Sequence, residues 1–158
     1  MDDDLLLRHA IDLAAQARAR GDHPFGALLV DDAGEIVATA LNSVNTESDP
    51  TGHAETNLVR IAGRELTEHD RAATTLYTST EPCAMCAGAI FWAGIPTVVF
   101  ALSESELLTL TGDDPANPSM SLPCRDVFAA GAHPTAVRGP FPIVEAREVH
   151  AGFWRPSS

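Results

Sequence analysis

The sequence predicts an α/β fold, with helices packed on both faces of a sheet. Segments with the apolar spacing of helices alternate along the chain with short runs rich in β-branched and aromatic residues. No linker, repeat or low-complexity tract divides the 158 residues, of which 45% are hydrophobic and 20% charged. Such alternation is typical of layered α/β proteins, so we expect a single domain spanning residues 1–158.

The first third of the chain predicts a helix followed by a hairpin. Residues 5–20 carry apolar side chains at helical spacing, with three aspartates before them and a glycine after them. Residues 25–30 and 36–41 are interpreted as strands, joined by a tight turn at 31–34. The polar stretch 42–52 then predicts a loop.

The middle of the chain continues the alternation. We expect a helix over 53–62, a strand over 74–78, a helix over 83–93 and a strand over 97–101. A proline precedes the second of these helices and a glycine follows each, as is common at helix ends.

The last third is less regular. Residues 102–124 show no clear period, and 112–118 predict a long turn. Residues 127–130 are interpreted as helical, 135–138 as a last strand and 144–154 as a closing helix.

The charge of the chain restricts its partners. Its formal net charge is −12, and its ten basic residues are all arginine. The absence of lysine excludes Schiff-base catalysis and a P-loop, and the acidic balance disfavours nucleic-acid binding. No apolar run is long enough for a membrane span, and an acidic start does not fit a secretory signal peptide, so we expect a cytoplasmic protein without membrane partners.

Two short segments supply metal ligands and a carboxylate. His53 and Glu55 begin one predicted helix, and Cys83 and Cys86 begin the next. Three protein ligands leave a zinc ion with a position for water, as in catalytic sites. The carboxylate two residues after the histidine can then transfer protons, so the pattern indicates an enzyme that activates water on zinc.

The pairing of the two segments makes this signal specific. A lone C-x-x-C in a cytosolic chain is also compatible with a redox or a structural zinc site. The order H-x-E followed by P-C-x-x-C is typical of zinc deaminases. Cys124 is interpreted as a packed thiol, because a fourth thiolate would displace the water.

Three stretches resemble the cytidine deaminase-like superfamily over about residues 5–101. They are Pro24-Phe25-Gly26-Ala27, the Asp49-Pro50-Thr51 stretch that leads to His53, and residues 75–90, which include Glu-Pro-Cys-Ala-Met-Cys. Within the superfamily the chain looks most similar to bacterial guanine deaminases, with cytosine deaminases and tRNA adenosine deaminases nearby. The resemblance implies a three-layer α/β/α sandwich around a mixed five-stranded sheet, and a homodimer.

The resemblance also implies roles for individual residues. The zinc ligands would be His53, Cys83 and Cys86, and the proton shuttle would be Glu55. Substrate contacts would come from the side chains of Phe25, Asn42 and Trp154 and the backbone amide of Ala54.

Three further residues are less firmly tied to this pattern. The acid that contacts the amine in guanine deaminases falls at about Glu106, with Glu104 as the alternative. His23 precedes Pro24-Phe25 and could reach the mouth of the pocket, but a surface loop role is favoured.

The implied function is zinc-dependent hydrolytic deamination of a small nucleobase or related heterocycle, with guanine to xanthine and ammonia as the first candidate. Cytosine or nucleoside deamination and tRNA adenosine deamination are the alternatives. A non-enzymatic zinc scaffold is disfavoured, because it leaves Glu55 without a purpose.

Overall fold

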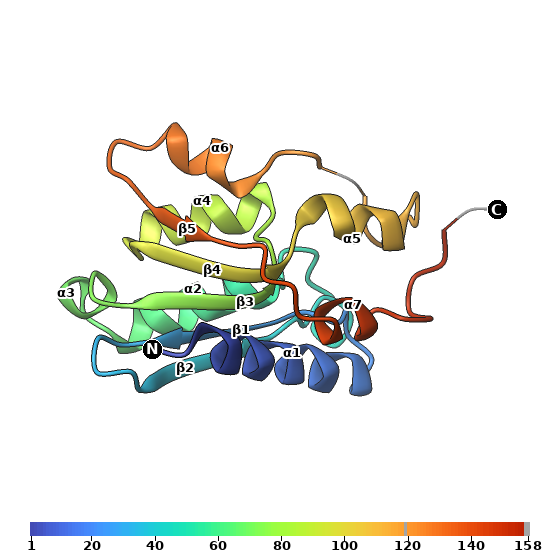
Figure 1. The fold of residues 1–158 in the computed structure, drawn as a ribbon, viewed down its shortest axis with the longest axis horizontal. Coiled ribbons are helices and arrows are strands. Elements are labelled where there is room, and N and C mark those ends of the chain that lie inside the picture. Colours follow the sequence, from blue (N-terminus) through green and yellow to red (C-terminus); the bar gives the residue numbers. More distant parts are fainter. Residues whose placement is uncertain (119, 157–158) are drawn as a thin grey trace.

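The computed structural model describes residues 1–118 and 120–156 as a central sheet covered by helices on two faces (Figure 1). The strands are β1 (Gly26–Val30), β2 (Ile36–Leu41), β3 (Thr75–Thr80), β4 (Thr97–Leu102) and β5 (Ala136–Arg138). The helices are α1 (Asp3–Ala19), α2 (Ala54–Glu65), α3 (Glu68–Arg71), α4 (Ala84–Ala93), α5 (Glu104–Thr111), α6 (Cys124–Ala129) and α7 (Glu145–Glu148).

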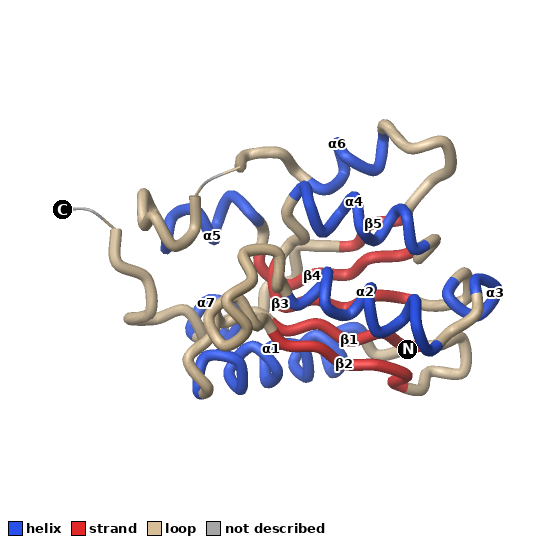
Figure 2. The backbone as a smooth tube through the Cα atoms, turned by 180° about the vertical axis from the view of Figure 1, so that it is seen from behind, coloured by secondary structure: helices blue, strands red, loops and turns tan. Residues whose placement is uncertain are grey.

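The sheet is mixed and has the order β2-β1-β3-β4-β5. The hairpin pair β1–β2 and the pair β1–β3 are antiparallel, whereas β3–β4 and β4–β5 are parallel. Because β3 and β4 run in the same direction, the segments that follow them leave from the same edge of the sheet. Figure 2 shows the starts of α4 and α5 at that edge.

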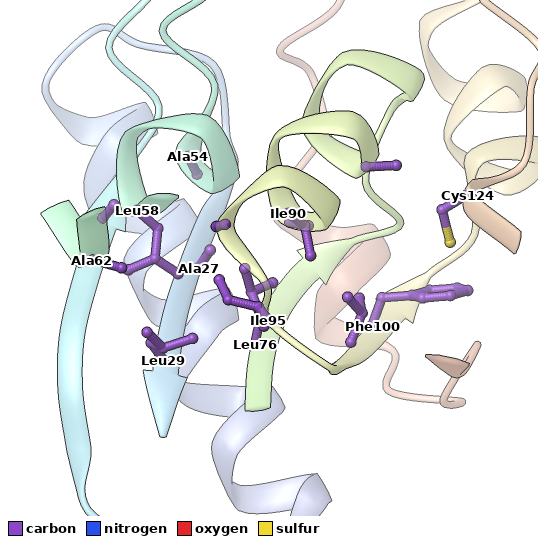
Figure 3. Packing of buried hydrophobic residues seen from close by; sticks show 14 of the residues in the cluster. Ala27, Leu29, Ala54, Leu58, Ala62, Leu76, Ile90, Ile95, Phe100 and Cys124 are labelled. Carbon is purple, nitrogen blue, oxygen red and sulfur yellow. The ribbon is translucent and has the colours of Figure 1, made fainter. Parts of the chain in front are cut away.

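Two apolar cores fill the space between the layers. On one face, α2, α4 and α6 pack against the sheet through Leu58, Ile90 and Phe128 (Figure 3). On the other face, α1 and the segment around α7 cover the sheet through Leu7 and Ile143. The three-layer sandwich and the mixed five-stranded sheet are therefore confirmed.

Most elements match their predicted positions, and four do not, among them the short helix α3, which the sequence analysis did not predict. The helix α2 runs through Gly63, where the sequence predicted its end, because a glycine weakens a helix without stopping it. The predicted closing helix over 144–154 is wrong: α7 is a single turn, and Gly152 then adopts the left-handed φ of 71°. Helix α5 lies in the stretch that showed no clear period, with Ser103 as its N-cap.

Among the described residues, no helix combines the length and the hydropathy that crossing a bilayer requires.

Helix α1 approaches β1 closely at Gly26. A Cβ at this position would lie 2.5 Å from both the Ala10 carbonyl oxygen and the Ala14 amide nitrogen. Because these are backbone atoms, Gly26→Ala forces α1 away from the sheet, and we expect a loss of about 1–3 kcal/mol in the free energy of unfolding. Urea denaturation measures this loss.

Gly63→Ala is the matched control for this prediction. It adds the same methyl group on the exposed side of α2, where nothing lies within 4 Å, and should leave stability unchanged or slightly raised. Equal stability of the two variants would contradict the close approach at Gly26.

Candidate active site

Three potential metal ligands meet at the starts of two neighbouring helices. His53 is the N-cap of α2, Cys83 is the N-cap of α4, and Cys86 lies in the first turn of α4. The Sγ atoms of Cys83 and Cys86 lie 3.5 and 3.6 Å from His53 Nδ1, and all three ligand atoms are within 4.8 Å of one another. The fold therefore brings the three predicted ligands together.

The donor set fits zinc in chemistry and in spacing. A tetrahedral zinc with Zn–N and Zn–S bonds of about 2.0 and 2.3 Å separates the nitrogen and sulfur ligands by about 3.6 Å. The observed separations agree with that value. The hydrogen bond with Cys86 lowers the pKa of the Cys83 thiol well below its ordinary value, and His53 lowers it further, which favours the thiolate that zinc binds. Cys124 lies apart from this cluster, buried in the core at the start of α6.

Glu55 lies in the first turn of α2 and is buried beside the ligands. The hydroxyl of Thr78 on β3 donates a hydrogen bond of 2.6 Å to its Oε1 atom. Burial raises the pKa of the Glu55 carboxyl above its ordinary value, although the Thr78 hydrogen bond acts in the opposite direction. A raised pKa makes the Glu55 carboxylate a stronger proton acceptor than an exposed glutamate.

A cavity of about 420 Å³ opens onto Glu55 and two of the ligands, His53 and Cys83. Its base is formed by His53, Glu55, Thr80, Glu81 and Cys83. The lining residues Leu107, Pro115, Ala116, Asn117, Pro118 and Met120 are here called the roof. The roof comes from α5 and the irregular stretch after it, so no local sequence pattern predicted that these residues line the cavity.

One wall of the cavity is aromatic. Phe25 lines it, as the sequence predicted for a pocket wall, and so does His23. The interpretation of His23 as a surface residue is wrong, since only 8% of it is exposed. Trp154 is buried behind this wall, with its ring centroid 5.2 Å from that of His23 and 6.0 Å from that of Phe25. It therefore supports the wall and does not line the cavity.

Asn42 and Ala54 lie next to the cavity and are not part of its lining. The Asn42 side chain accepts a hydrogen bond of 3.0 Å from the Val44 amide through Oδ1. In the described part of the chain, its Nδ2 donates no hydrogen bond and so remains able to bind a ligand atom. The Ala54 side chain packs into the core, whereas His53 and Glu55 on either side of it line the cavity.

The structure brings Glu104 to the cavity and does not bring Glu106 there. Glu104 lines the cavity at the start of α5. Burial raises the pKa of its carboxyl to about 7, and the nearby Cys83 thiol and Glu81 carboxylate add to this shift. Glu106 lines a different cavity, between α5 and the segment around α7. Residues two apart in a helix point in different directions, which explains why only one of the two acids reaches the ligands.

A family model matches residues 1–102 of the chain, described as the cytidine and deoxycytidylate deaminase zinc-binding region. The matched part contains all three ligands, Glu55 and both sides of the β1–β2 hairpin. It ends before the roof.

Several curated proteins are similar to the chain. A protein of Schizosaccharomyces pombe named "Probable cytosine deaminase" is 45% identical over 94% of this chain and 90% of its own length. The tRNA-specific adenosine deaminase of Haemophilus influenzae is 41% identical over 65% of this chain and 59% of its own length. The guanine deaminase of Bacillus subtilis is 39% identical over 72% of this chain and 73% of its own length.

A solved structure of guanine deaminase from Nitrosomonas europaea superposes with a TM-score of 0.73. It covers 92% of this chain and 83% of that one, at 24% identity, and therefore supports the fold alone.

Proposed function

The chain belongs to the cytidine and deoxycytidylate deaminase zinc-binding family, and on that premise we propose that residues 1–158 form one domain that removes the amino group of a free nucleobase, with guanine as the first candidate. The observation that carries the proposal is that Glu55 lines one cavity together with His53 and Cys83, which form a ligand cluster with Cys86. Two predictions stay predictions: a homodimer and a cytoplasmic location.

The size and polarity of the cavity support a base as the substrate. At about 420 Å³ it falls in the lower part of the range of 300–1,000 Å³ typical of small-molecule pockets. Phe25 offers an aromatic face for stacking on one wall, and Glu104 offers a carboxyl group that can accept hydrogen bonds from ring or exocyclic N–H groups. Guanine presents both an aromatic ring system and several such N–H groups.

The proposed chemistry replaces the amino group of the base with oxygen from water and releases ammonia. A zinc ion held by His53, Cys83 and Cys86 would supply the acidified water. Thr78 fixes Glu55 through Oε1, so Oε2 would be the atom that accepts a proton from water and passes it to a ring nitrogen. The oxygen of this water would form a bond to the amine-bearing carbon. The Glu55 carboxylate would then take the second proton, from the new hydroxyl group, and give it to the amine as the carbon–nitrogen bond breaks and ammonia leaves.

Cytosine is the second candidate, because the relative named "Probable cytosine deaminase" matches 94% of the chain. The tRNA alternative is less favoured, since a net charge of −12 opposes the binding of a phosphate backbone. Ammonia release by the zinc-loaded protein from guanine, cytosine, adenine and their nucleosides tests the proposal, with Glu55→Gln as the blank. Guanine turnover would support it, and turnover of cytosine would reassign the substrate. No turnover of any base would overturn it.

Glu104 is the residue we expect to bind the N–H groups of the substrate. Glu104→Gln replaces a charge-assisted hydrogen bond with a neutral one, so kcat/KM should fall by about 10- to 100-fold. Steady-state kinetics on the best base measures this fall. Glu106→Gln is the matched control, because it makes the same change two residues along α5 at a position outside the cavity. A larger fall in kcat/KM for Glu106→Gln than for Glu104→Gln would assign the binding of the substrate N–H groups to Glu106 instead.

A further inference from the structure

The Glu81 carboxylate links two distant parts of the chain. Glu81 follows β3 directly and is 8% exposed. Its Oε1 atom accepts a hydrogen bond of 3.0 Å from the Glu104 amide, and its Oε2 atom accepts one of 2.9 Å from the Cys124 amide. Its own backbone N–H donates to the Leu102 carbonyl oxygen at 2.7 Å, which fixes it beside the end of β4.

Both amides are the first helical residues of their elements. Glu104 begins α5 and Cys124 begins α6, and the first N–H groups of a helix have no acceptor within it. One buried carboxylate satisfies a donor at each of these two helix starts, where the helix dipoles also favour negative charge. Removing it would leave both donors without their acceptor, which is costly in a buried place.

The two linked amides stand at the two ends of the segment that carries the roof. Leu107 belongs to α5, and Pro115 to Pro118 and Met120 follow it before α6 begins. Glu81 is also two residues before the ligand Cys83. A single side chain therefore connects both ends of the roof segment to the strand end that carries a zinc ligand.

We propose that Glu81 is a positioning residue, which holds the roof and Glu104 at a fixed place relative to the ligands and thereby sets the affinity for the base. This inference rests on the proposed function. If Glu81 served only to stabilise the two helices, its loss would lower the stability of the protein and leave the KM for the base unchanged.

Glu81→Gln is the informative variant, because its amide oxygen can accept only one of the two hydrogen bonds while its NH₂ group faces the other donor. We expect faster hydrogen–deuterium exchange in the segments containing the Glu104 and Cys124 amides. We also expect a KM about tenfold higher or more, with kcat within about threefold and zinc still at one ion per chain.

Asp3→Asn is the matched control. Asp3 is a partly buried carboxylate that accepts a hydrogen bond of 2.6 Å from the Tyr77 hydroxyl and pairs with Arg138, and it lines no part of the cavity. Its loss should lower the melting temperature without changing KM. An active wild type whose KM is unchanged in Glu81→Gln would overturn this inference alone. A wild type that deaminates no base would overturn the proposed function and this inference with it.

Discussion

Glu55→Gln is expected to lower kcat by about 10³- to 10⁴-fold while zinc remains bound at one ion per chain. Glutamine has the same shape and can still accept the Thr78 hydrogen bond through its amide oxygen, so the fold and the cavity should be retained. It cannot take a proton from water or deliver one to the departing amine. Ammonia release on the preferred base, with metal content measured on the same sample, tests this expectation.

A control variant shows whether Glu55 acts by transferring protons or only by packing. Glu106→Gln, prepared in parallel, makes the same chemical change at a carboxyl outside the cavity and should keep wild-type turnover. Retained activity in Glu55→Gln would contradict the role of Glu55, whatever the substrate.

Cys86→Ser is expected to release zinc and abolish turnover. A serine hydroxyl stays protonated near neutral pH and is a poor zinc ligand, and only two of the three ligands would remain. The loss of zinc affinity should exceed the roughly 10- to 100-fold that removal of a supporting hydrogen bond costs a metal site. Metal analysis after dialysis against a weak chelator measures it.

Cys124→Ser is the control for this second prediction. The Cys124 thiol is also buried, and it lies outside the ligand cluster, so its replacement should cost stability and leave zinc in place. If Cys124→Ser lost its zinc, or if Cys86→Ser kept it, the ligand set would have to be revised.

The parts of the site that lie on short, local patterns could be predicted from the sequence. Cys83 and Cys86 are three residues apart, so spacing alone places them on one side of a helix start, and His53 and Glu55 are recognised from the short H-x-E pattern. The strands were predicted for a similar reason, because β1, β2, β3 and β4 are short runs rich in apolar or β-branched residues.

The parts that depend on tertiary contacts could not be predicted. His23 and the roof residues reach the cavity only because the chain folds back over the end of the sheet. Which of Glu104 and Glu106 faces the cavity depends on the rotation of α5 about its axis. A loose resemblance in sequence to guanine deaminases does not determine this rotation. The prediction of a closing helix over 144–154 was wrong because the aromatic residues at the C-terminal end pack on the wall around Phe25 instead of continuing the helix.

The roof and the ligands occupy separate stretches of the chain, and this separation has an evolutionary consequence. Mutations between α5 and α6 can reshape what the cavity admits without disturbing His53, Cys83 or Cys86. Substitutions in the roof can therefore change which base the protein accepts, while the residues that carry out the reaction are inherited unchanged. Protein families that share the reaction but differ in substrate specificity would arise in this way from one ancestral fold.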